Sequence, residues 1–310
     1  MLPKPDISCA RDRHVLATCE AYSGVLTSED RLKKGGKKMN LTYDTIRVEK
    51  DNGTTWVIFN RPEKRNAMSP QLHFDMDDAL AHLAKDDETK VLIITGSGVS
   101  FSAGQDLKTY FRETANNPDL RARSQAASNR WRWHRLVQFP KPTIAMINGF
   151  CFGGAFTQVC ACDIAISADE ATFGLSEVNW GVIPGGIVSW NIAEVLSHRD
   201  ALFYAMTGLP FDGKKAADIK LVNFSVPLDK LREETIRIAE VLKEKNPAAL
   251  RATKEAVRQV RGMNHDQAQN FLAAKLTELV AKDKDKGMQK GLSQFLDDKS
   301  YRPGFQSLKN

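Results

Sequence analysis

The sequence has only five cysteines and no long hydrophobic run, and both features narrow the classes of protein that it can encode. None of its 310 residues lies in a run approaching the roughly 20 apolar residues that cross a bilayer. The first residues also lack the apolar core of a signal peptide. We therefore expect a cytoplasmic protein with no membrane partner.

The five cysteines are an odd number and include no pair of CxxC motifs, which argues against a disulfide framework and against a zinc site. Cys160 and Cys162 flank one alanine in an apolar stretch, a spacing typical of packing in a helix core. The histidines have no ligand-like spacing either. We therefore expect reduced thiols and no metal ion.

Nucleotide-binding motifs are missing as well, since no GxxxxGK run precedes a Ser or Thr and no GxGxxG follows a strand. The net charge is +6, and residues 1–38 supply +3 of it from eight Lys or Arg against five Asp or Glu. The remaining +3 is a mild excess. It suits an enzyme that attracts a phosphorylated anion such as coenzyme A as well as it suits an RNA-binding protein.

Residues 1–38 show no sustained periodicity and end in a basic run directly before Met39. The peptide Gly-Gly-Lys-Lys-Met at this point is what a purine-rich ribosome-binding site and its start codon encode when translated in frame. We therefore predict that residues 1–38 are a non-native or disordered extension and that Met39 is the native start. A transit peptide is the alternative, although five acidic residues count against it.

The folded region is predicted to open with two antiparallel strands and a helix. Apolar residues alternate over 46–48 and 55–59, and the Asn-Gly pair between them suits a tight hairpin. Ser69 followed by Pro70 is typical of a helix N-cap and first turn, and an apolar helical face continues to Leu83.

Short apolar runs further along the chain predict a buried sheet. Val91–Thr95 and Thr143–Ile147 are expected strands that end in glycine-containing loops, and 164–167 and 221–226 continue the pattern with helices between. The order of these elements predicts an α/β core.

Helical periodicity dominates from Leu228 onward, with a break expected at Pro247. The prediction is therefore an α/β core over residues 39–227 and a C-terminal helical region over residues 228–310. No long internal repeat is visible.

Two loops share a design that suits an anionic oxygen. Segments 101–107 and 149–155 each follow a strand and contain small residues that let the backbone approach a ligand. Each leads into a helix whose first N–H groups are unpaired. Tight turns with close packing are the alternative explanation.

One carboxylate in an apolar segment is the candidate acid or base. Glu177 lies in the run 171–186, where its neighbours include Leu175, Val178 and Trp180. Burial among such side chains disfavours the ionised carboxylate and raises its pKa toward a range useful for proton transfer. A solvated surface glutamate is the alternative.

Four ordered motifs together resemble the crotonase (enoyl-CoA hydratase/isomerase) superfamily. They are NRPEKRNAM at 60–68, FSAGQDL at 101–107, AMINGFCFGG at 145–154 and FGLSE at 173–177. Within the superfamily, the runs NRPEKRNAMS, ADEATFGLSE and QFLDDKS are similar to those of the hydroxycinnamoyl-CoA hydratase-lyases. The resemblance covers essentially residues 43–303.

The resemblance implies a crotonase-like spiral of strand-strand-helix units with a helical C-terminal trimerisation region, assembled as a homotrimer or a dimer of trimers. It implies that the backbone N–H groups of Gln105 and Gly154 form an oxyanion hole and that Glu177 carries the proton. Coenzyme A would enter only as part of substrate and product, with Lys64 near its phosphate. The residues implied in substrate binding are Lys64, Ala67, Ala103, Leu107, Tyr110, Thr157, Ser176 and Trp180.

One departure from the family pattern bears on the reaction. Simple enoyl-CoA hydratases carry a second glutamate three residues after the oxyanion glycine, where this chain has Thr157. A para-hydroxyl on an aromatic substrate eases water addition without that carboxylate. The resemblance therefore implies hydration of a trans-4-hydroxycinnamoyl-CoA (feruloyl, 4-coumaroyl or caffeoyl), followed by retro-aldol cleavage to a vanillin-type aldehyde and acetyl-CoA.

Recognition of the aryl ring is less defined. Tyr110 is a candidate partner for the substrate phenol and Trp180 for an apolar wall, with core packing as the alternative for each. Similar enzymes carry tyrosines just before an Ala-Lys-Leu on a C-terminal helix, whereas Phe271 and Ala273 stand there in this chain. The preferred ring substituents therefore remain open.

Two other functions compete with this one. The nearer is another crotonase activity, such as plain enoyl-CoA hydration or isomerisation. The other is a non-catalytic RNA-binding protein of the same fold, suggested by the tryptophans and arginines of segment 130–135. Helical packing with arginines that extend to solvent is the alternative account of that segment, and we expect no nucleic-acid partner.

Overall fold

The computed structural model describes residues 42–300 and 302, so the prediction for residues 1–38 lies outside the described part of the chain. The predicted hairpin is confirmed: β1 (Ile46–Asp51) and β2 (Thr54–Phe59) pair in antiparallel fashion. Asn52 and Gly53 turn the chain with φ angles of 43° and 79°. Positive φ is the geometry that an Asn-Gly pair adopts most readily.

Helix α1 (Pro70–Leu83) begins where the sequence predicts it. The Ser69 hydroxyl accepts a hydrogen bond from the Leu72 N–H at 3.2 Å, and Pro70 occupies the first turn. Leu72, Met76 and Leu80 are fully buried on the face toward the sheet. Burial of each such side chain stabilises the fold by about 1.5–3 kcal/mol.

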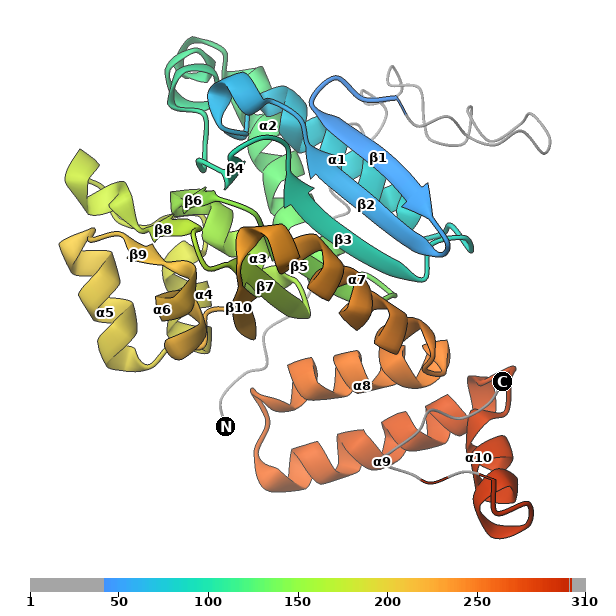
Figure 1. Cartoon of the computed structure of the whole chain (residues 1–310). Coiled ribbons are helices and arrows are strands. Elements are labelled where there is room, and N and C mark those ends of the chain that lie inside the picture. Colours follow the sequence, from blue (N-terminus) through green and yellow to red (C-terminus); the bar gives the residue numbers. More distant parts are fainter. Residues whose placement is uncertain (1–41, 301, 303–310) are drawn as a thin grey trace, which may run out of the picture. The chain divides into compact units, whose positions relative to one another are not determined.

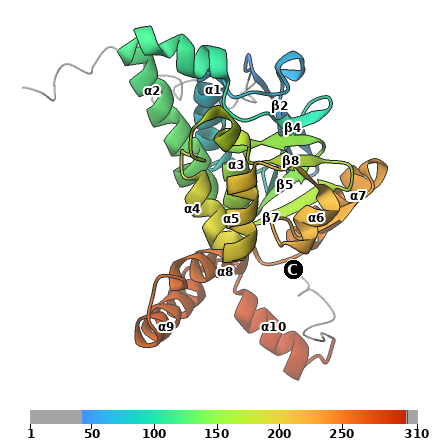
Figure 2. The same ribbon diagram turned by 90° about the vertical axis from the view of Figure 1, so that its left-hand side faces the viewer.

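The larger sheet has the strand order β1-β2-β3-β5-β7-β10 and is parallel from β2 onward. Its core strands are buried on both faces, which explains their continuous apolar sequences. Figures 1 and 2 show α1 and α7 on opposite faces of this sheet. The remaining strands are β3 (Val91–Gly96), β5 (Thr143–Ile147), β7 (Ile164–Ala168) and β10 (Phe224–Val226).

The strand predicted over residues 221–226 is shorter than expected, because β10 contains only Phe224–Val226. The N–H groups of Leu221 and Val222 both donate to the Ala216 carbonyl, at 2.9 and 3.3 Å. The chain therefore turns back on the end of the preceding helix before it joins the sheet.

A second, four-stranded sheet was not predicted from the sequence. Its order is β4-β6-β8-β9 (Figure 1), and its strands of two or three residues are too short to show a periodicity. They are β4 (Ser100–Ser102), β6 (Phe150–Phe152), β8 (Thr172–Gly174) and β9 (Phe211–Asp212).

Helices and short helical turns connect the strands. The α-helices of this part are α2 (Pro118–Asn129), α3 (Phe156–Ala161), α4 (Val188–Val195), α5 (His198–Thr207) and α6 (Gly213–Asp218). The 3-10 turns are η1 (Pro62–Lys64), η3 (Thr114–Asn116), η5 (Gly153–Ala155) and η6 (Ser176–Trp180). Two π-helical turns are η2 (Leu107–Arg112) and η4 (Arg130–Arg135).

From Leu228 to Ser300 the structure has four α-helices, in the region where helical periodicity dominates the sequence. Asn246 caps the second of them by accepting from the Ala249 N–H at 2.8 Å, with Pro247 in the first turn. Lys275 pairs with Glu255 at 2.7 Å and so ties the third helix to the second. The helices are α7 (Leu228–Lys243), α8 (Pro247–Val260), α9 (His265–Lys282) and α10 (Gly287–Leu296).

Cys151, Cys160 and Cys162 are free thiols in the described part of the chain. Burial raises the pKa of Cys160 and of Cys162 to about 12, so both thiols stay protonated at neutral pH and pack as apolar groups. No helix among the described residues is long and apolar enough to cross a bilayer.

Candidate active site

The small sheet brings three of the sequence motifs to one edge. Strand β4 pairs in parallel with β6, and β6 pairs in parallel with β8, with Phe152 opposite Gly174. Because the carboxyl ends of parallel strands meet at the same edge, the loops that follow them lie together. These loops carry Gln105, Gly154 and Glu177.

Gly104 lets the first two loops touch. It has a φ of +86°, and a Cβ atom there would lie 2.7 Å from the Phe152 carbonyl oxygen and 3.3 Å from the Gly154 nitrogen. A side chain at this position would therefore clash with backbone at a φ that favours glycine. The contact places the two predicted oxyanion loops within van der Waals distance.

The N–H groups of Gln105 and Gly154 lie in this contact region. The Met68 N–H donates to the Gly104 carbonyl at 2.8 Å and the Asp106 N–H donates to the Met68 carbonyl at 3.1 Å. Among residues 42–300 no oxygen accepts the Gln105 N–H between them. Gly154 is in the first turn of η5, where N–H groups have no partner within the helix. The structure thus brings together the two donors that the sequence predicts.

Asn66, in the motif at 60–68, has a structural role, because its side chain bonds three backbone groups. Its buried side chain donates to the carbonyls of Ser97 and Ser100 at 2.9 and 2.8 Å and accepts from the Arg61 N–H at 2.9 Å. Its φ of 54° lies in the left-handed region, which asparagine tolerates better than most residues. The first motif therefore holds the segment that leads into the Gln105 loop in place, a role that sequence reasoning did not assign.

Arg61 and Asp106 form a second link between these motifs, with 3.0 Å between Nη1 and Oδ2. Burial disfavours the ionised Asp106 carboxylate, but hydrogen bonds from Thr109 and Arg61 outweigh it and hold its pKa below the ordinary value. Asp106 also caps η2 through the Lys108 and Thr109 N–H groups. The loop that carries Gln105 is therefore fixed at both ends.

Four of the residues implied in substrate binding lie on these linked segments, namely Lys64, Ala67, Ala103 and Leu107, which the family resemblance assigns to the coenzyme A site. The Ala103 N–H donates to the Arg65 carbonyl at 2.9 Å, and the Ala67 N–H donates to the Lys64 carbonyl at 3.0 Å. The side chains of Lys64 and Leu107 are exposed, so a ligand can reach them.

Glu177 lies against the second loop. A Cβ atom at Gly153 would sit 3.0 Å from Glu177 Oε1, and Glu177 Oε2 is buried without a hydrogen-bond partner among the described residues. Burial raises the pKa of this carboxyl above its ordinary value, and a hydrogen bond from its own backbone opposes the shift. The carboxylate therefore faces the loop that carries Gly154.

The apolar neighbours predicted to bury Glu177 do so only in part. Leu175 is fully buried, but the Val178 and Trp180 side chains are 40% and 68% exposed. We therefore attribute the burial mainly to the Gly153 loop. Ser176 is half-buried at the start of η6, beside the carboxylate in sequence.

Thr157 replaces the second glutamate of simple hydratases with a buried hydroxyl. Its Oγ1 atom is buried and has no hydrogen-bond partner among residues 42–300. It lies in α3, directly after the turn that carries Gly154.

A buried histidine network behind Gln105 was missed by sequence reasoning. The Trp131 indole N–H donates to His73 Nδ1 at 2.9 Å, and His73 Nε2 lies 2.9 Å from Gln105 Oε1. Because Trp131 can only donate, Nε2 carries the proton and donates to Gln105. Burial, and then the Arg132 charge, lower the pKa of His73 to about 3, so the ring is neutral. The Tyr110 ring lies edge-on to His73 at 5.1 Å.

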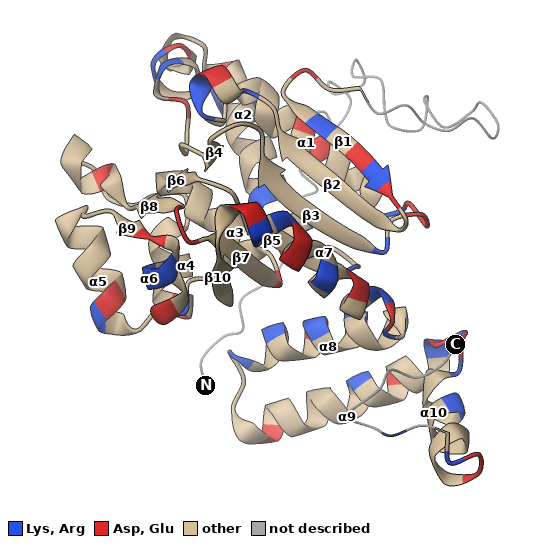
Figure 3. Cartoon of the chain, in the orientation of Figure 1, with Lys and Arg blue, Asp and Glu red and all other residues tan. Residues whose placement is uncertain are grey.

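Segment 130–135 differs from the prediction of arginines that extend to solvent. Arg130 and Arg135 do so and pair with Asp77 at 2.7 and 2.6 Å. Arg132 is only 4% exposed and Trp131 is fully buried, so the prediction is wrong for Arg132. Trp131 therefore presents no face on which a base can stack. Figure 3 shows basic and acidic residues interleaved along α7.

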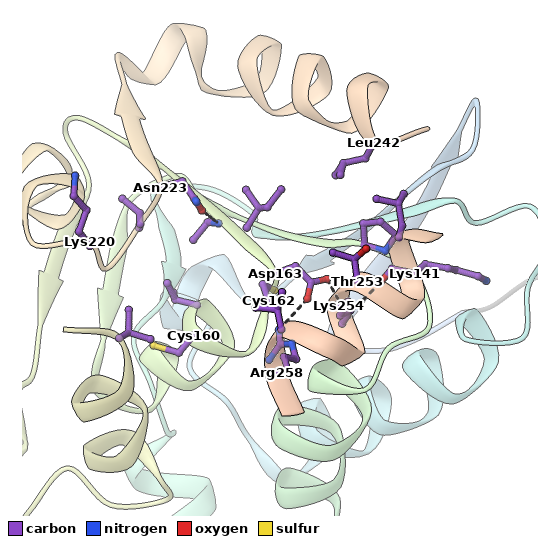
Figure 4. Close-up of a pocket in the computed structure, with 18 of the residues that line it drawn as sticks. Lys141, Cys160, Cys162, Asp163, Lys220, Asn223, Leu242, Thr253, Lys254 and Arg258 are labelled. Carbon is purple, nitrogen blue, oxygen red and sulfur yellow. Dashed lines mark hydrogen bonds and ion pairs between the residues drawn. The ribbon is translucent and has the colours of Figure 1, made fainter. Parts of the chain in front are cut away.

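A pocket of about 530 Å³ lies elsewhere, between the sheet and α8 (Figure 4). It adjoins Cys162 and Asp163 before β7 and Pro142 before β5, so it lies at the amino ends of the strands. Two of its cations, Lys254 and Arg258, already pair with Asp163 at 2.8 and 2.9 Å. Ligands of parallel α/β sheets bind at the carboxyl ends, and we assign the chemistry to the motif loops.

Comparison with known proteins gives consistent matches. The model of the family described as enoyl-CoA hydratase/isomerase matches residues 49–304. A hydroxycinnamoyl-CoA hydratase-lyase of Pseudomonas fluorescens is 49% identical over 268 residues, which cover 86% of this chain and 97% of that protein.

Solved structures match over a similar length. The crystal structure of an enoyl-CoA hydratase from Bacillus anthracis superimposes with a TM-score of 0.74 at 28% identity, covering 81% of this chain and 96% of that one. An enoyl-CoA hydratase from Polaromonas sp. JS666 gives a TM-score of 0.75 at 26% identity, covering 82% and 97%.

Proposed function

Because the chain belongs to the enoyl-CoA hydratase/isomerase family, we propose that it hydrates a trans-4-hydroxycinnamoyl-CoA thioester and cleaves the product to an aromatic aldehyde and acetyl-CoA. The observation that carries the proposal is one carboxylate, Glu177, set against the Gly153 loop, with Thr157 in place of a second carboxylate. The name of the Pseudomonas relative supports this substrate class.

The hydration step uses the carboxylate as a base and then as an acid. Glu177 takes a proton from water as the oxygen bonds to the β carbon, and the double-bond electrons move onto the thioester oxygen. The N–H groups of Gln105 and Gly154 stabilise the resulting enolate. Each such donor is worth about 3–4 kcal/mol in the transition state. Glu177 then returns the proton to the α carbon.

The cleavage step reverses these roles at the β-hydroxyl group. Glu177 takes the hydroxyl proton, the oxygen forms the aldehyde double bond, and the Cα–Cβ bond breaks. Its electron pair becomes the acetyl-CoA enolate in the same oxyanion hole. Protonation of the α carbon by Glu177 yields acetyl-CoA and restores the carboxylate. No cofactor beyond coenzyme A takes part.

A para-hydroxyl on the ring compensates for the absent second carboxylate, because it donates electrons toward the β carbon during water addition. The position of Tyr110 supports a contact with this ring, because Tyr110 follows the Gln105 loop in η2 and packs against His73. We assign the phenol contact to Tyr110, the apolar wall to Trp180 and a hydrogen bond to the reacting oxygen to Thr157.

We also propose that the protein assembles into a homotrimer or a dimer of trimers through its C-terminal helices. Apolar side chains on α9 and α10 are exposed in the single chain, as an interface requires. They are Leu272, Leu276, Val280, Met288, Leu292, Phe295 and Leu296.

The test is product analysis with feruloyl-CoA and 4-coumaroyl-CoA. We expect the aldehyde and acetyl-CoA in equal amounts, and crotonyl-CoA in parallel to react far more slowly because it lacks the aryl hydroxyl. A β-hydroxy thioester that accumulates without aldehyde would instead identify a plain hydratase. RNA binding that survives Glu177→Gln, with no thioester turnover, would support the non-catalytic alternative.

A further inference from the structure

Arg132 is a buried cation without an anion beside it. Its side chain is 4% exposed, and no carboxylate in residues 42–300 lies within ion-pair distance of its guanidinium. Its Nε atom is buried and has no hydrogen-bond partner among the same residues. Burial lowers its pKa to about 10, which leaves it positively charged at neutral pH.

The guanidinium touches the oxyanion loop. Its Nη1 atom donates to the Gly154 carbonyl at 3.4 Å, and a Cβ atom at Gly154 would lie 3.4 Å from Nη1. On its other side, Nη2 would lie 3.3 Å from a Cβ atom at Gly186, in the loop that follows Glu177. Arg132 therefore lies between the two loops that bear the proposed catalytic groups.

The Gly154 carbonyl does not need this charge. In its favoured orientation the neutral Gln158 amide donates to the same oxygen at 2.9 Å. Burial of an unpaired cation is unfavourable, so a need to satisfy this carbonyl does not explain the guanidinium. An anion that forms during the reaction would balance the positive charge of Arg132.

We infer that Arg132 is a positioning residue for the oxyanion loop, and that its charge is balanced by the enolate which forms at the Gly154 N–H. The inference rests on the proposed place of the enolate, but not on aldehyde formation. A fixed positive charge in a water-poor site stabilises a developing anion more than it does in water. The contact with the Gly154 carbonyl also holds the loop in its orientation.

The test uses acetoacetyl-CoA, which ionises to an enolate with a distinct near-ultraviolet absorbance. We expect Arg132→Gln to lower the enolate fraction of the bound thioester at least about tenfold, with the Kd for coenzyme A changed less than about twofold. Arg132→Lys keeps the charge and is expected to recover most of the enolate fraction. The matched control is Arg130→Gln on the same turn, which removes an exposed arginine paired with Asp77.

Several outcomes would overturn the inference. One is an enolate fraction in Arg132→Gln equal to that of Arg130→Gln. Another is a folded Arg132→Lys variant that forms as little enolate as Arg132→Gln, because charge is then not the cause. If Arg132→Gln does not fold, as judged by thermal unfolding, the Lys variant alone decides. Enolate formation in a protein that releases no aldehyde would refute the proposed function and leave this inference standing.

Discussion

At the scale of single residues, the site consists of polar groups whose states depend on burial. Glu177 has its pKa raised by desolvation, whereas His73 has its pKa lowered by the same effect. The difference follows from their charges, because burial disfavours the anion of one and the cation of the other. Both groups are therefore biased toward their neutral forms.

Replacement of Glu177 by Gln is expected to lower kcat by about 10²- to 10⁴-fold, because the proton then has no acceptor. In the native enzyme, kcat/KM should fall on the acid side with a pKa above the ordinary glutamate value of 4.5. A pH–rate profile with 4-coumaroyl-CoA measures this limb. If the residual activity of Glu177→Gln falls at the same acidic pH as that of the native enzyme, the pKa belongs to another group.

The same substitution is expected to stabilise the fold at pH 7. A carboxyl whose pKa is raised on folding stabilises the protein below its unfolded pKa, and this contribution is lost as the pH rises through the folded pKa. Ionised Glu177 therefore opposes folding at neutral pH. Urea unfolding of the native enzyme and Glu177→Gln at pH 7 measures the difference, and a less stable variant contradicts this account.

His73 should make the protein sensitive to acid. Its pKa falls from 6.5 to about 3 on folding, so below pH 6.5 the unfolded chain binds a proton that the folded protein does not. Stability should then fall by about 1.4 kcal/mol per pH unit until the folded pKa is reached. Unfolding free energies of His73→Asn between pH 7 and pH 4 should show a shallower slope. The control is His134→Asn, at an exposed position.

The sequence predicted some of these residues and not others. Glu177, Gln105 and Gly154 lie in motifs that resemble a known family, so their positions were predictable. Arg132 was predicted to reach solvent, because an arginine between tryptophans gives no local sign of burial. The burial comes from loops 22 and 54 residues away in sequence, which no local pattern contains.

At the scale of elements, the active site is a product of short parallel strands. Helices and long strands were predictable from their periodicity, and β3, β5 and α1 begin where expected. Strands β4, β6 and β8 have three residues each and were not. Their pairing depends on contacts between distant segments rather than on local pattern.

Gly104→Ala is expected to lower activity by more than a substitution that introduces backbone strain alone. A Cβ atom at this position would force apart the loops that carry Gln105 and Gly154. Gly181→Ala is a matched control, because Gly181 has a similar φ of +74° but nothing within 4 Å of a Cβ atom. We expect a loss of at least about 100-fold in kcat only for Gly104→Ala. Equal losses would show that strain, not separation of the loops, is responsible.

At the scale of the whole molecule, the resemblance predicted both the family and the α/β spiral with C-terminal helices, and both are confirmed. In the single chain, apolar side chains on α9 and α10 are exposed to solvent.

Leu276→Glu should weaken the proposed assembly. Burial of an exposed leucine is worth about 1.5–3 kcal/mol, so loss of this contact should weaken association by about 10- to 100-fold per interface. Sedimentation velocity over a range of concentrations measures the change. Val99→Glu is the control, because Val99 is also exposed, 69% against 58% for Leu276, but lies outside the C-terminal helices, directly before β4. If both variants assemble like the native protein, α9 is not part of the interface.

The three-residue strands of the small sheet also limit which insertions and deletions this enzyme can accept during evolution. Side chains of neighbouring positions point to opposite faces of a strand, so one inserted residue in β6 would turn its loop glycines by half a revolution. A strand of this length has no spare pairs with which to absorb the slip. New substrate preferences are therefore open to this scaffold by exchange of side chains on the loops, whereas changes in chain length are restricted to segments outside the sheet.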